Sequence, residues 1–512
     1  MKLERFIGAL SENHLLVSTN GESTKALCNE ITGITYNSKN VKPGFIFICK
    51  GAHFKKQYLV DAINNGACCY FSETSYDIGP DFPAVIVNDI RFAMPILSKL
   101  FYGDLSKEIG MIGITGTKGK STTTYLTRQI LNDYMESIGQ NPVAVCSGIE
   151  NYDGVSLVES HLTTPENLEL YEHMNNAINS GISHMVMEVS SQALKYGRVS
   201  GIDYEVGCFL NIGQDHISPI EHSDYGDYFH SKLRILDSCR IACINLDCKE
   251  QGALRKKASN CKRVLTFSQK SKDANIFADN IESDDGHVSF DLIVSNVNGY
   301  ESISDEKDNR SVSTHIELAV FGTINIENAL ASSAIAVALD VPLEFIKSGL
   351  IKAVAPGRME VFRSYDSTKI VLVDYAHNTL SYEALFKSIK KEFPTRDLVI
   401  VFGCAGGKAL SRREALGELA GIYCKKTYLT EEDCGEEDCM SICEEISKYV
   451  AKTGGDYEIV VDRVKALSKA IEEADESVIV IAAGKGREKT QKRGTEYVTV
   501  PSDVEVTMQS LF

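Results

Sequence analysis

No apolar stretch of this chain approaches the ~20 residues that a membrane-spanning helix needs. The amino-terminal residues Met1–Arg5 do not lead into the long apolar segment that marks a secretory signal. The 15 cysteines include no Cys-x-x-Cys pair, and an odd number without a disulfide framework is typical of reduced thiols. These absences predict a cytoplasmic protein with no membrane insertion.

The chain has fewer positively charged than negatively charged side chains. The chain carries 53 Lys and Arg against 70 Asp and Glu, which gives a net charge of −17. A groove for nucleic acid needs the opposite sign, so we expect no nucleic-acid partner. A nucleotide substrate is still compatible with this balance, because local lysine and glycine clusters bind phosphates within acidic proteins. The sequence contains no internal repeat or low-complexity tract.

A chain of 512 residues is too long for one hydrophobic core, and its pattern divides into three segments. Residues 1–107 alternate short strand-like runs with helical ones. Residues 108–355 include short apolar runs typical of parallel strands, then a polar stretch that predicts exposed antiparallel strands. Residues 356–512 follow a Pro-Gly linker and return to strand–helix alternation, which indicates a doubly wound α/β domain.

The most informative segment is Gly116–Thr122, which directly follows the apolar run Met111–Thr115. A strand, a glycine-rich turn and a helix in this order aim backbone N–H groups at a phosphate chain. Lys120 would reach the terminal phosphates, and the Ser121 hydroxyl would ligate magnesium. The alternative is a glycine-rich turn that binds no ligand. The usual phosphate-loop pattern has a further glycine at the position of Ile114, so this loop is a shortened form.

The shortened loop resembles that of the Mur ligase and folylpolyglutamate synthetase superfamily. Further blocks resemble the Mur ligases, and among them the tripeptide-synthetase branch, in the order found in that family. These blocks are Thr163–Glu166, Glu188–Leu194, Asn211–His216, Tyr228–Lys232, Gly322–Ala329, Pro356–Glu360 and Asp374–Asn378. Each block alone is weak, but together they are specific and span most of the chain.

The resemblance implies an α/β protein with the three-domain Mur ligase architecture. Residues 1–107 would form a UDP-binding domain, and 108–355 a central ATP-binding domain around a P-loop ATPase-like parallel sheet. Residues 356–512 would form a Rossmann-like domain that binds the incoming amino acid. The implied activity needs ATP and Mg²⁺. It activates UDP-N-acetylmuramoyl-L-alanyl-D-glutamate as an acyl phosphate, which an amino acid then attacks. We expect a monomer.

Four residues form the catalytic set that the resemblance implies. Glu188 lies at the carboxyl end of an apolar strand and His216 lies just past the next one, where ligands of magnesium occur in such sheets. Lys120 would contact the phosphates. Lys232 would be carbamylated, so that this cation becomes an anionic ligand of a second magnesium ion. The metal ligands would be Ser121, Glu188, His216 and Lys232. The alternatives are a capping glutamate, a loop histidine and a solvated lysine.

The nucleotide site that the resemblance implies combines the loop with residues far along the chain. Its members are Gly116, Thr117, Lys118, Gly119, Lys120, Ser121, Thr122, Asn328, Arg358, Asp374, His377 and Asn378. His377 and Asn378 follow the predicted strand Ile370–Tyr375, at the edge where open α/β sheets bind ligands. An ordinary turn is the alternative for this last block.

A second group of residues matches positions that bind the muramoyl-peptide in the family. They are Ser38, Thr163, Thr164, Ser190 and Arg198. Arg198 could pair with a substrate carboxylate in a bidentate manner, whereas the threonine pair could instead cap a helix. The stretches Thr35–Ser38 and Lys50–Lys55 resemble the grip on uridine diphosphate.

The identity of the added amino acid depends on the stretch Thr430–Asp438. Family members that add meso-diaminopimelate carry an Asp-Asn-Pro-Arg block, and Gly435 stands where that Arg would lie. The acidic residues of this stretch, among them Glu432 and Asp433, would favour a side chain that ends in an ammonium group. We therefore expect L-lysine, or a close diamine such as ornithine. Against this, Glu488, a further expected substrate-binding residue, is retained where the members that add meso-diaminopimelate also carry a glutamate. Two alternatives are a guanidinium supplied by Arg487, which would restore meso-diaminopimelate, and a solvated loop without a ligand.

Two other functions compete with this interpretation. One is another ligase of the superfamily, such as a folylpolyglutamate or cyanophycin synthetase, against which the blocks at Thr163 and Glu188 argue. The other is a nucleotide-binding protein without catalysis, against which the complete set of Lys120, Glu188, His216, Lys232 and His377 argues.

Overall fold

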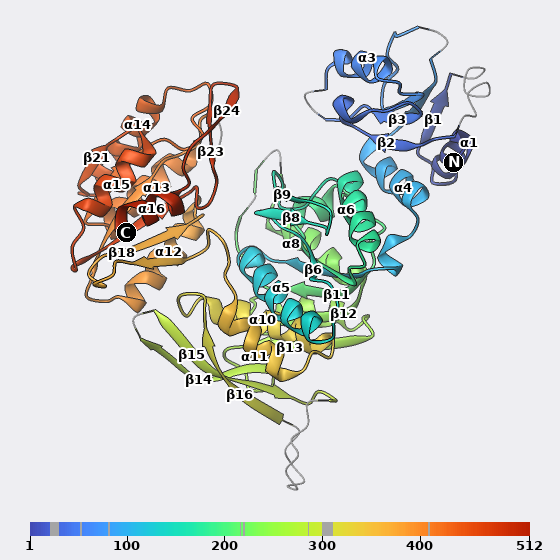
Figure 1. Ribbon diagram of the computed structural model, residues 1–512. Coiled ribbons are helices and arrows are strands. Elements are labelled where there is room, and N and C mark those ends of the chain that lie inside the picture. The colour runs from blue at the N-terminus through green and yellow to red at the C-terminus, as the bar shows by residue number, and fades with distance from the viewer. Residues whose placement is uncertain are drawn as a thin grey trace. The chain divides into compact units, whose positions relative to one another are not determined.

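A computed structural model describes residues 1–20, 30–51, 54–79, 82–215, 217–218, 221–284, 286–299, 311–407 and 410–512 (Figure 1). Helices and parallel sheets alternate along the chain, which confirms the predicted α/β class. The chain divides into two compact units, one of Met1–Lys120 with Tyr134–Leu265 and one of Ser121–Asp133 with Thr266–Phe512. The boundaries that we predict for three domains stay a prediction.

The amino-terminal part of the first unit is a five-stranded sheet in the order β1-β5-β4-β3-β2. Its strands are β1 (Leu16–Thr19), β2 (Gly33–Thr35), β3 (Phe45–Ile48), β4 (Cys69–Ser72) and β5 (Ala84–Val87). Its helices are α1 (Leu3–Glu12), α3 (Lys56–Asn64) and α4 (Ile90–Tyr102), and two short 3₁₀ helices are η1 (Ser38–Asn40) and η2 (Leu105–Lys107). Only β1 pairs antiparallel, with β5, so this part of the chain is a mainly parallel α/β layer as the alternation predicts.

The second sheet of this unit runs in the order β12-β11-β6-β10-β7-β8-β9. Its strands are β6 (Gly110–Thr115), β7 (Ala144–Cys146), β8 (Glu150–Tyr152), β9 (Leu157–Glu159), β10 (His184–Glu188), β11 (Tyr204–Phe209) and β12 (Cys239–Asn245). The associated helices are α5 (Lys120–Ser137), α6 (Asn167–Asn179), α7 (Ser191–Lys195), α8 (Tyr225–Leu233), η3 (Arg234–Asp237) and α9 (Gln251–Ala258). Strands β6, β7, β10, β11 and β12 are parallel, so the ends of β6, β10 and β11 meet at one edge, where the site residues lie.

The second unit begins with an antiparallel sheet, which confirms the strands predicted in the polar stretch. Strands β14 (Ile276–Asp284), β15 (His287–Ser295) and β16 (Ser311–Leu318) are antiparallel, whereas β13 (Arg263–Ser268) pairs parallel with β14. Side chains of β15 alternate between buried and half-buried, because one face packs on the core. An alanine-rich helix, α10 (Asn325–Ala338), follows the sheet, and α11 (Leu343–Lys352) comes next.

The last part of the chain is a six-stranded sheet in the order β17-β18-β22-β19-β20-β21. Its strands are β17 (Glu360–Arg363), β18 (Ile370–Asp374), β19 (Asp397–Phe402), β20 (Lys426–Leu429), β21 (Tyr457–Ile459) and β22 (Val478–Ala483). Its helices are α12 (Thr379–Glu392), α13 (Ser411–Tyr423), α14 (Cys439–Lys452), α15 (Arg463–Glu472) and α16 (Asp503–Leu511), with a hairpin of β23 (Thr490–Arg493) and β24 (Glu496–Thr499).

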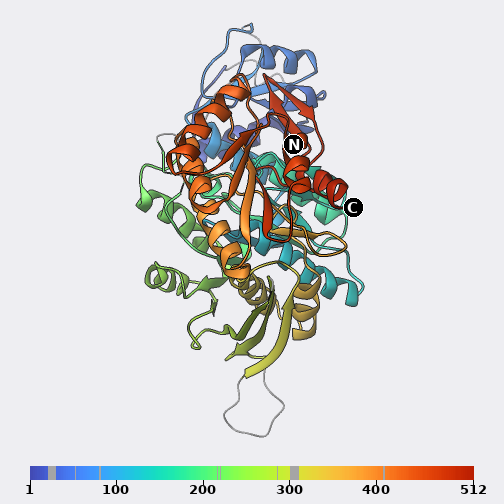
Figure 2. The ribbon, with the colours of Figure 1, turned by 90° about the vertical axis from the view of Figure 1, so that its left-hand side faces the viewer.

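Apolar strands of this sheet are buried on both faces. Ile370 and Leu372 pack against α12, α13 and α14, whereas Val371 and Val373 pack against α15 and α16. Figure 2 shows the sheet between its two layers of helices. Such coverage explains why β18 and β22 are continuous apolar runs, and it confirms the doubly wound pattern predicted from the sequence.

The cysteine pattern differs from the sequence-based expectation at one pair. Cys434 and Cys439 form a disulfide, with their Cα atoms 5.4 Å apart. The expectation of entirely reduced thiols is therefore wrong at this position, where the two cysteines flank the start of α14 and are brought together by the turn before it. Across the described ranges, no helix is both long and apolar enough to cross a membrane.

Candidate nucleotide and peptide-ligase site

The phosphate loop has the predicted conformation of strand, turn and helix. Strand β6 ends at Thr115 and α5 begins at Lys120. Gly119 occupies the N-cap with φ 82°, in the left-handed region that favours glycine. A side chain on Gly116 would place its Cβ 2.8 Å from the Cβ of Leu210, so this position also requires glycine. The loop therefore presents its backbone amides at the positive end of an 18-residue helix.

The segment after β11 holds the loop in place. The backbone N–H of Thr117 donates to the carbonyl of Asn211 over 3.1 Å, and the N–H of Lys118 donates to the Asn211 Oδ1 over 3.0 Å. The Thr117 hydroxyl lies 3.1 Å from the Tyr228 hydroxyl and accepts the N–H of Gly213 over 3.0 Å. Motif blocks that are about 100 residues apart in the chain thus form one structure, as the resemblance implies.

Lys120 folds back over its own loop. Its Nζ donates to the carbonyls of Gly116 and Thr117, over 3.0 and 3.3 Å. The ammonium group is therefore held inside the concave turn, where the phosphate-loop prediction requires a cation.

Lys232 lies on α8 and is only 1% exposed. Its Nζ donates to the Gly116 carbonyl over 2.8 Å and lies 4.9 Å from the centre of the Tyr228 ring. Burial, followed by the positive charge of Lys120, holds the pKa of Lys232 well below its ordinary value. The alternative interpretation of Lys232 as a solvated lysine is therefore wrong. Its surroundings favour the neutral amine form beside the phosphate loop.

Glu188 ends strand β10 and is 1% exposed. Its Oε1 accepts the backbone N–H of Gly148 over 2.8 Å, which fixes the carboxylate at the carboxyl edge of the sheet. The Thr164 hydroxyl donates to the Glu188 carbonyl over 2.9 Å and accepts the N–H of Ser190 over 2.9 Å. Thr164 and Ser190 thus lie in the same local structure as Glu188, and their roles toward a substrate stay predictions.

The threonine pair does not cap the following helix. Glu166 is the N-cap residue of α6, so the alternative interpretation of Thr163 and Thr164 as caps is wrong. Ser190 does cap a helix, since its side chain accepts the N–H of Ala193 over 3.1 Å at the start of α7.

Arg198 and Ser38 occupy different surroundings. Arg198 places its Nε 3.3 Å from Glu166 Oε1. Ser38 begins the short helix η1, where its carbonyl accepts the side-chain amide of Asn65 over 2.9 Å.

The magnesium site is only partly described. His216 lies outside the described residues, as do Ala52 and His53 of the predicted uridine-diphosphate grip. Asp215, which directly precedes His216 in the sequence, pairs with Lys118 over 3.4 Å. Within the described part of the chain, no three His, Cys, Asp or Glu side chains form a metal-binding group. The Ser121 hydroxyl and the Glu188 carboxylate nevertheless supply hard oxygen donors, which Mg²⁺ prefers alongside phosphate oxygens.

Two of the predicted nucleotide residues reach the first turns of α5. The Arg358 Nη2 donates to the Ser121 hydroxyl over 3.3 Å, and its guanidinium lies 4.7 Å from the centre of the Tyr375 ring. The Asn328 Oδ1 accepts the Thr123 hydroxyl over 3.2 Å. The structure therefore brings Arg358 and Asn328 to the helix that follows the phosphate loop.

The block Asp374–Asn378 forms the turn between β18 and α12. The Asp374 carboxylate accepts the backbone N–H groups of Met359 and Ala376, over 2.8 and 2.7 Å. The Asn378 side chain caps α12, and the His377 Nδ1 lies 2.8 Å from the Tyr375 carbonyl. These contacts shape the carboxyl edge of the sheet, and contacts to a nucleotide stay a prediction.

Most acidic residues of the stretch Thr430–Asp438 have partners within the protein. Asp433 accepts the Lys485 ammonium over 3.1 Å and the N–H of Lys492 over 2.8 Å. Glu437 pairs with the buried Arg413 over 2.7 Å, and Asp438 caps α14. The sequence cannot show the ion pairs, because Lys485 and Arg413 come from other parts of the chain, whereas Asp438 caps α14 through the nearby Ser441.

Glu432 and the exposed Glu436 are the exceptions. Glu432 forms no hydrogen bond or ion pair with the residues that the structure describes, and a side chain at Gly484 would collide with its carboxylate. Burial, partly opposed by the charges of Arg463 and Lys485, raises the pKa of Glu432 to about 7. Arg463 and Lys485 act on this half-buried carboxylate without forming an ion pair with it, so its ionised form is suited to a cationic ligand.

Glu488 shares a cation with Asp433. Lys485 is 3% exposed and pairs with both carboxylates, and the Tyr375 hydroxyl donates to Glu488 over 2.5 Å. The sequence analysis assigns no role to Lys485, which lies three residues before Glu488, or to Tyr375, which lies within the block Asp374–Asn378. A lysine between two glycines was the available signal, since it indicates a side chain that the backbone must pack closely around.

Arg487 is engaged elsewhere. Its Nε and Nη2 donate to the two oxygens of Glu360 over 2.8 and 2.6 Å, in a bidentate ion pair. The Glu360 side chain is only 9% exposed, so Arg487 neutralises a buried carboxylate of its own chain.

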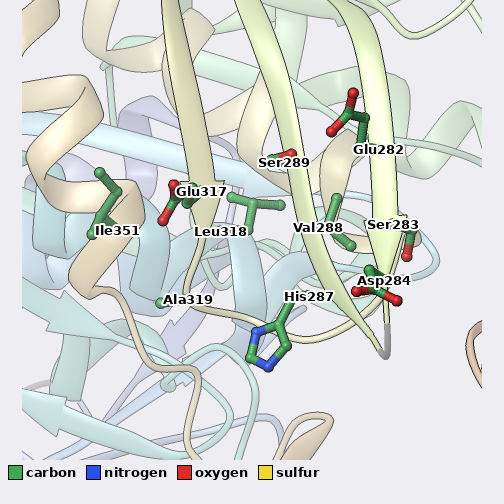
Figure 3. Close-up of a pocket in the computed structure, with 10 residues that line it drawn as sticks. All are labelled: Glu282, Ser283, Asp284, His287, Val288, Ser289, Glu317, Leu318, Ala319 and Ile351. Atoms are coloured by element: carbon green, nitrogen blue, oxygen red, sulfur yellow. The ribbon is translucent and has the colours of Figure 1, made fainter.

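A cavity of about 380 Å³ lies elsewhere, on the antiparallel sheet β14–β16. Figure 3 shows its lining, which includes Glu282, His287, Leu318 and Ile351. None of the predicted site residues lines it.

Together, the phosphate loop and the doubly wound domain define a nucleotide-binding α/β protein with the layout of an ATP-dependent ligase. Residues 114–336 match the Mur ligase middle domain, and residues 357–486 match the Mur ligase glutamate ligase domain. The chain belongs to the Mur ligase family, whose members are ATP-dependent ligases that form peptide bonds. The resemblance found in the motif blocks is confirmed.

Relatives match over nearly their whole length. The UDP-N-acetylmuramyl-tripeptide synthetase of Lactobacillus delbrueckii subsp. bulgaricus is 33% identical over 510 residues, which cover 97% of this chain and 96% of that protein. The UDP-N-acetylmuramoyl-L-alanyl-D-glutamate–L-lysine ligase of Streptococcus pneumoniae is 33% identical over 475 residues, covering 92% and 91%.

Solved structures show the same fold. A UDP-N-acetylmuramoyl-L-alanyl-D-glutamate–2,6-diaminopimelate ligase superposes with a TM-score of 0.60 and 25% identity, covering 93% of this chain and 94% of that one. MurF ligase from Thermotoga maritima, in complex with ADP, gives a TM-score of 0.57 at 17% identity over 94% and 97%. The predicted three-domain Mur ligase architecture is consistent with these neighbours.

Proposed function

We propose that this protein joins L-lysine to UDP-N-acetylmuramoyl-L-alanyl-D-glutamate with ATP, in the synthesis of a peptidoglycan precursor. The relatives that match over almost the whole chain support the ligase assignment. The observation that carries the choice of lysine is Glu432, a carboxylate without a cationic partner among the described residues. The protein would act as a cytoplasmic monomer.

The first step activates the substrate. A carboxylate oxygen of the D-glutamate attacks the γ-phosphorus of ATP, and ADP leaves. Lys120 and the loop amides would hold the phosphates and offset the charge that the two anions bring together. Mg²⁺, held by Ser121 and Glu188 with His216 and a carbamylated Lys232, would neutralise phosphate oxygens when bound.

The second step forms the amide. The amine nitrogen of the amino acid attacks the acyl carbon, phosphate leaves, and the nitrogen loses a proton. Arg358 would meet a phosphate at the start of α5, and its contact with the Ser121 hydroxyl supports this role. Thr164, Ser190 and Arg198 would hold the muramoyl-peptide.

Glu432 would receive the ε-ammonium group of lysine. Gly435 stands where a guanidinium would be needed for the second carboxylate of meso-diaminopimelate, and Arg487 is already paired with Glu360. Burying an unpaired substrate carboxylate near Glu432 would cost several kcal/mol, so meso-diaminopimelate should be a poor substrate. Ornithine, which is shorter by one methylene, is the alternative diamine.

We expect lysine to give the highest kcat/KM in a panel of lysine, ornithine and meso-diaminopimelate. Discrimination against meso-diaminopimelate should be on the order of 10³-fold. The measurement is phosphate release with ATP, Mg²⁺ and the UDP-muramoyl dipeptide. A preference for meso-diaminopimelate would overturn the assignment and make Arg487 the first residue to test.

Gly435→Arg should shift the preference toward meso-diaminopimelate, but its backbone opposes the change. Gly435 has φ 60°, and a larger residue there is strained by about 1 kcal/mol even though no atom lies close to its Cβ position. Gly435→Asn is the matched control, because asparagine tolerates this conformation and adds no charge. If Gly435→Arg shifts the substrate preference and Gly435→Asn does not, the effect is due to the guanidinium group.

The affinity for lysine should depend on the ionisation of Glu432. This carboxyl is neutral below its pKa of about 7 and ionised above it, and only the ionised form pairs with an ammonium group. The KM for lysine should therefore fall by up to about tenfold per pH unit between pH 6 and 7, then level off. Glu432→Gln should raise the KM and remove this pH dependence, and an unchanged pH profile in that variant would contradict the role.

A further inference from the structure

One carboxylate, that of Glu166, lies between two cations from distant parts of the first unit. The Lys50 Nζ is 2.6 Å from Glu166 Oε2, and the Arg198 Nε is 3.3 Å from Glu166 Oε1. The side chain of Lys50 is only 16% exposed, that of Arg198 18% and that of Glu166 21%. The arrangement is therefore an enclosed anion site that one of the protein's own side chains fills.

The surroundings of this site hold Lys50 and Arg198 in place. The Lys50 Nζ lies 4.6 Å from the centre of the Tyr36 ring, while the Arg198 Nη1 donates to the Thr164 carbonyl over 3.5 Å. The Arg198 carbonyl accepts the side-chain amide of Asn167 over 2.8 Å. Both cations thus have support that does not depend on Glu166.

Two half-buried cations side by side are unfavourable without an anion between them. Burial lowers the pKa of Lys50, and the Glu166 carboxylate opposes that effect. An anion between the two cations therefore favours the charged form of Lys50, and a ligand that brings its own anion competes with Glu166 for this position.

We propose that Glu166 is a stand-in for an anionic group of the substrate, a carboxylate or a phosphate, which displaces it from Lys50 and Arg198 on binding. This proposal rests on the proposed function, because it takes the UDP-muramoyl dipeptide as the ligand. It adds Lys50 and Glu166 to the residues that set the affinity for that substrate. The exchange makes the site selective for anionic ligands, since a neutral analogue cannot replace the Glu166 carboxylate.

Position and helix chemistry make the exchange feasible. Glu166 is the N-cap residue of α6, so a displaced carboxylate would still lie at the positive end of that helix. Glu169 belongs to the same cluster, because its carboxylate accepts the Tyr36 hydroxyl and the backbone N–H of Glu166. The exposed Glu172 of α6 carries the same charge outside this cluster, so Glu166 and Glu172 offer a matched pair of variants on one helix.

The test is the affinity of Glu166→Gln for the substrate, measured by isothermal titration calorimetry with the full-length protein. Removing the competing charge should tighten binding of the UDP-muramoyl dipeptide by about fivefold or more. Glu172→Gln removes the same charge from an exposed position on the same helix and should change the affinity by less than about twofold. If Glu166 instead only orients the two cations, Glu166→Gln should weaken binding, and that result, or an unchanged affinity, overturns the proposal.

Two further ligands identify the anion that is exchanged. Tighter binding of UDP alone by Glu166→Gln assigns the site to the diphosphate, and tighter binding of the muramoyl dipeptide without UDP assigns it to a carboxylate. Either result supports the exchange. Melting curves of the variants confirm that they are folded. If the wild-type protein does not bind the UDP-muramoyl dipeptide at all, the proposed function fails. If the wild-type protein binds it and Glu166→Gln binds it no more tightly, only the proposed exchange is refuted.

Discussion

Lys120→Ala should abolish turnover, with kcat lowered by about 10³-fold or more. The Lys120 ammonium lies 3.0 and 3.3 Å from two carbonyls of the phosphate loop, inside the turn that would surround the transferred phosphoryl group. Removing it leaves the negative charge of the transition state without the cation that contacts both carbonyls. Lys232 also reaches the Gly116 carbonyl, but burial favours its neutral amine, so it should not replace the lost charge. Phosphate release with all three substrates present is the measurement.

Lys118→Ala is the matched control for this prediction. Lys118 belongs to the same loop, but its side chain is 35% exposed and pairs with Asp215 over 3.4 Å. Its loss should reduce turnover far less than the loss of Lys120. Near-normal phosphate release by Lys120→Ala would remove the phosphate loop from the mechanism, and an equal loss in both variants would indicate a general effect of charge.

The parts of the fold that repeat a local pattern could be predicted from the sequence. Short apolar runs gave β10, β11 and β12, because a strand covered on both faces needs no polar alternation. The phosphate loop could be predicted because its glycines are dictated by backbone geometry, which Gly116 and Gly119 confirm. The positions of Glu188 and Lys232 followed from motif blocks on these elements.

Pairings between distant side chains could not be predicted in this way. Nothing in the stretch around Asp433 indicates that Lys485 neutralises it, because the ion pair joins residues far apart in the chain. The same applies to Glu437 with Arg413. The number of acidic residues in the stretch Thr430–Asp438 therefore did not predict an acidic pocket. Among its half-buried carboxylates, Glu432 is the candidate to bind a cationic ligand. Cys434 and Cys439 were missed since their pairing depends on a turn that has no repeating pattern.

Lys232→Ala should be nearly inactive, with kcat lowered by about 10³-fold. Lys232 is 1% exposed and its Nζ lies 2.8 Å from the Gly116 carbonyl, so its charge state acts directly on the phosphate loop. Carbamylation joins the neutral amine nitrogen to the carbon of CO₂ and releases one proton, and the product is a carboxylate. The structure favours the neutral amine that this reaction needs, because burial and the charge of Lys120 disfavour the ammonium form.

A carbamate predicts two further results that a plain lysine does not. Acetate or formate should partly restore the activity of Lys232→Ala, since a small carboxylate can supply the missing oxygen ligand. Lys232→Arg keeps a positive charge but cannot form the carbamate, so it should be as inactive as Lys232→Ala. In ¹³C-labelled bicarbonate, the wild-type protein should show a carbamate resonance that Lys232→Ala lacks. Wild-type activity in Lys232→Arg would show that the position needs a cation, and a missing carbamate resonance in active enzyme would exclude the modification.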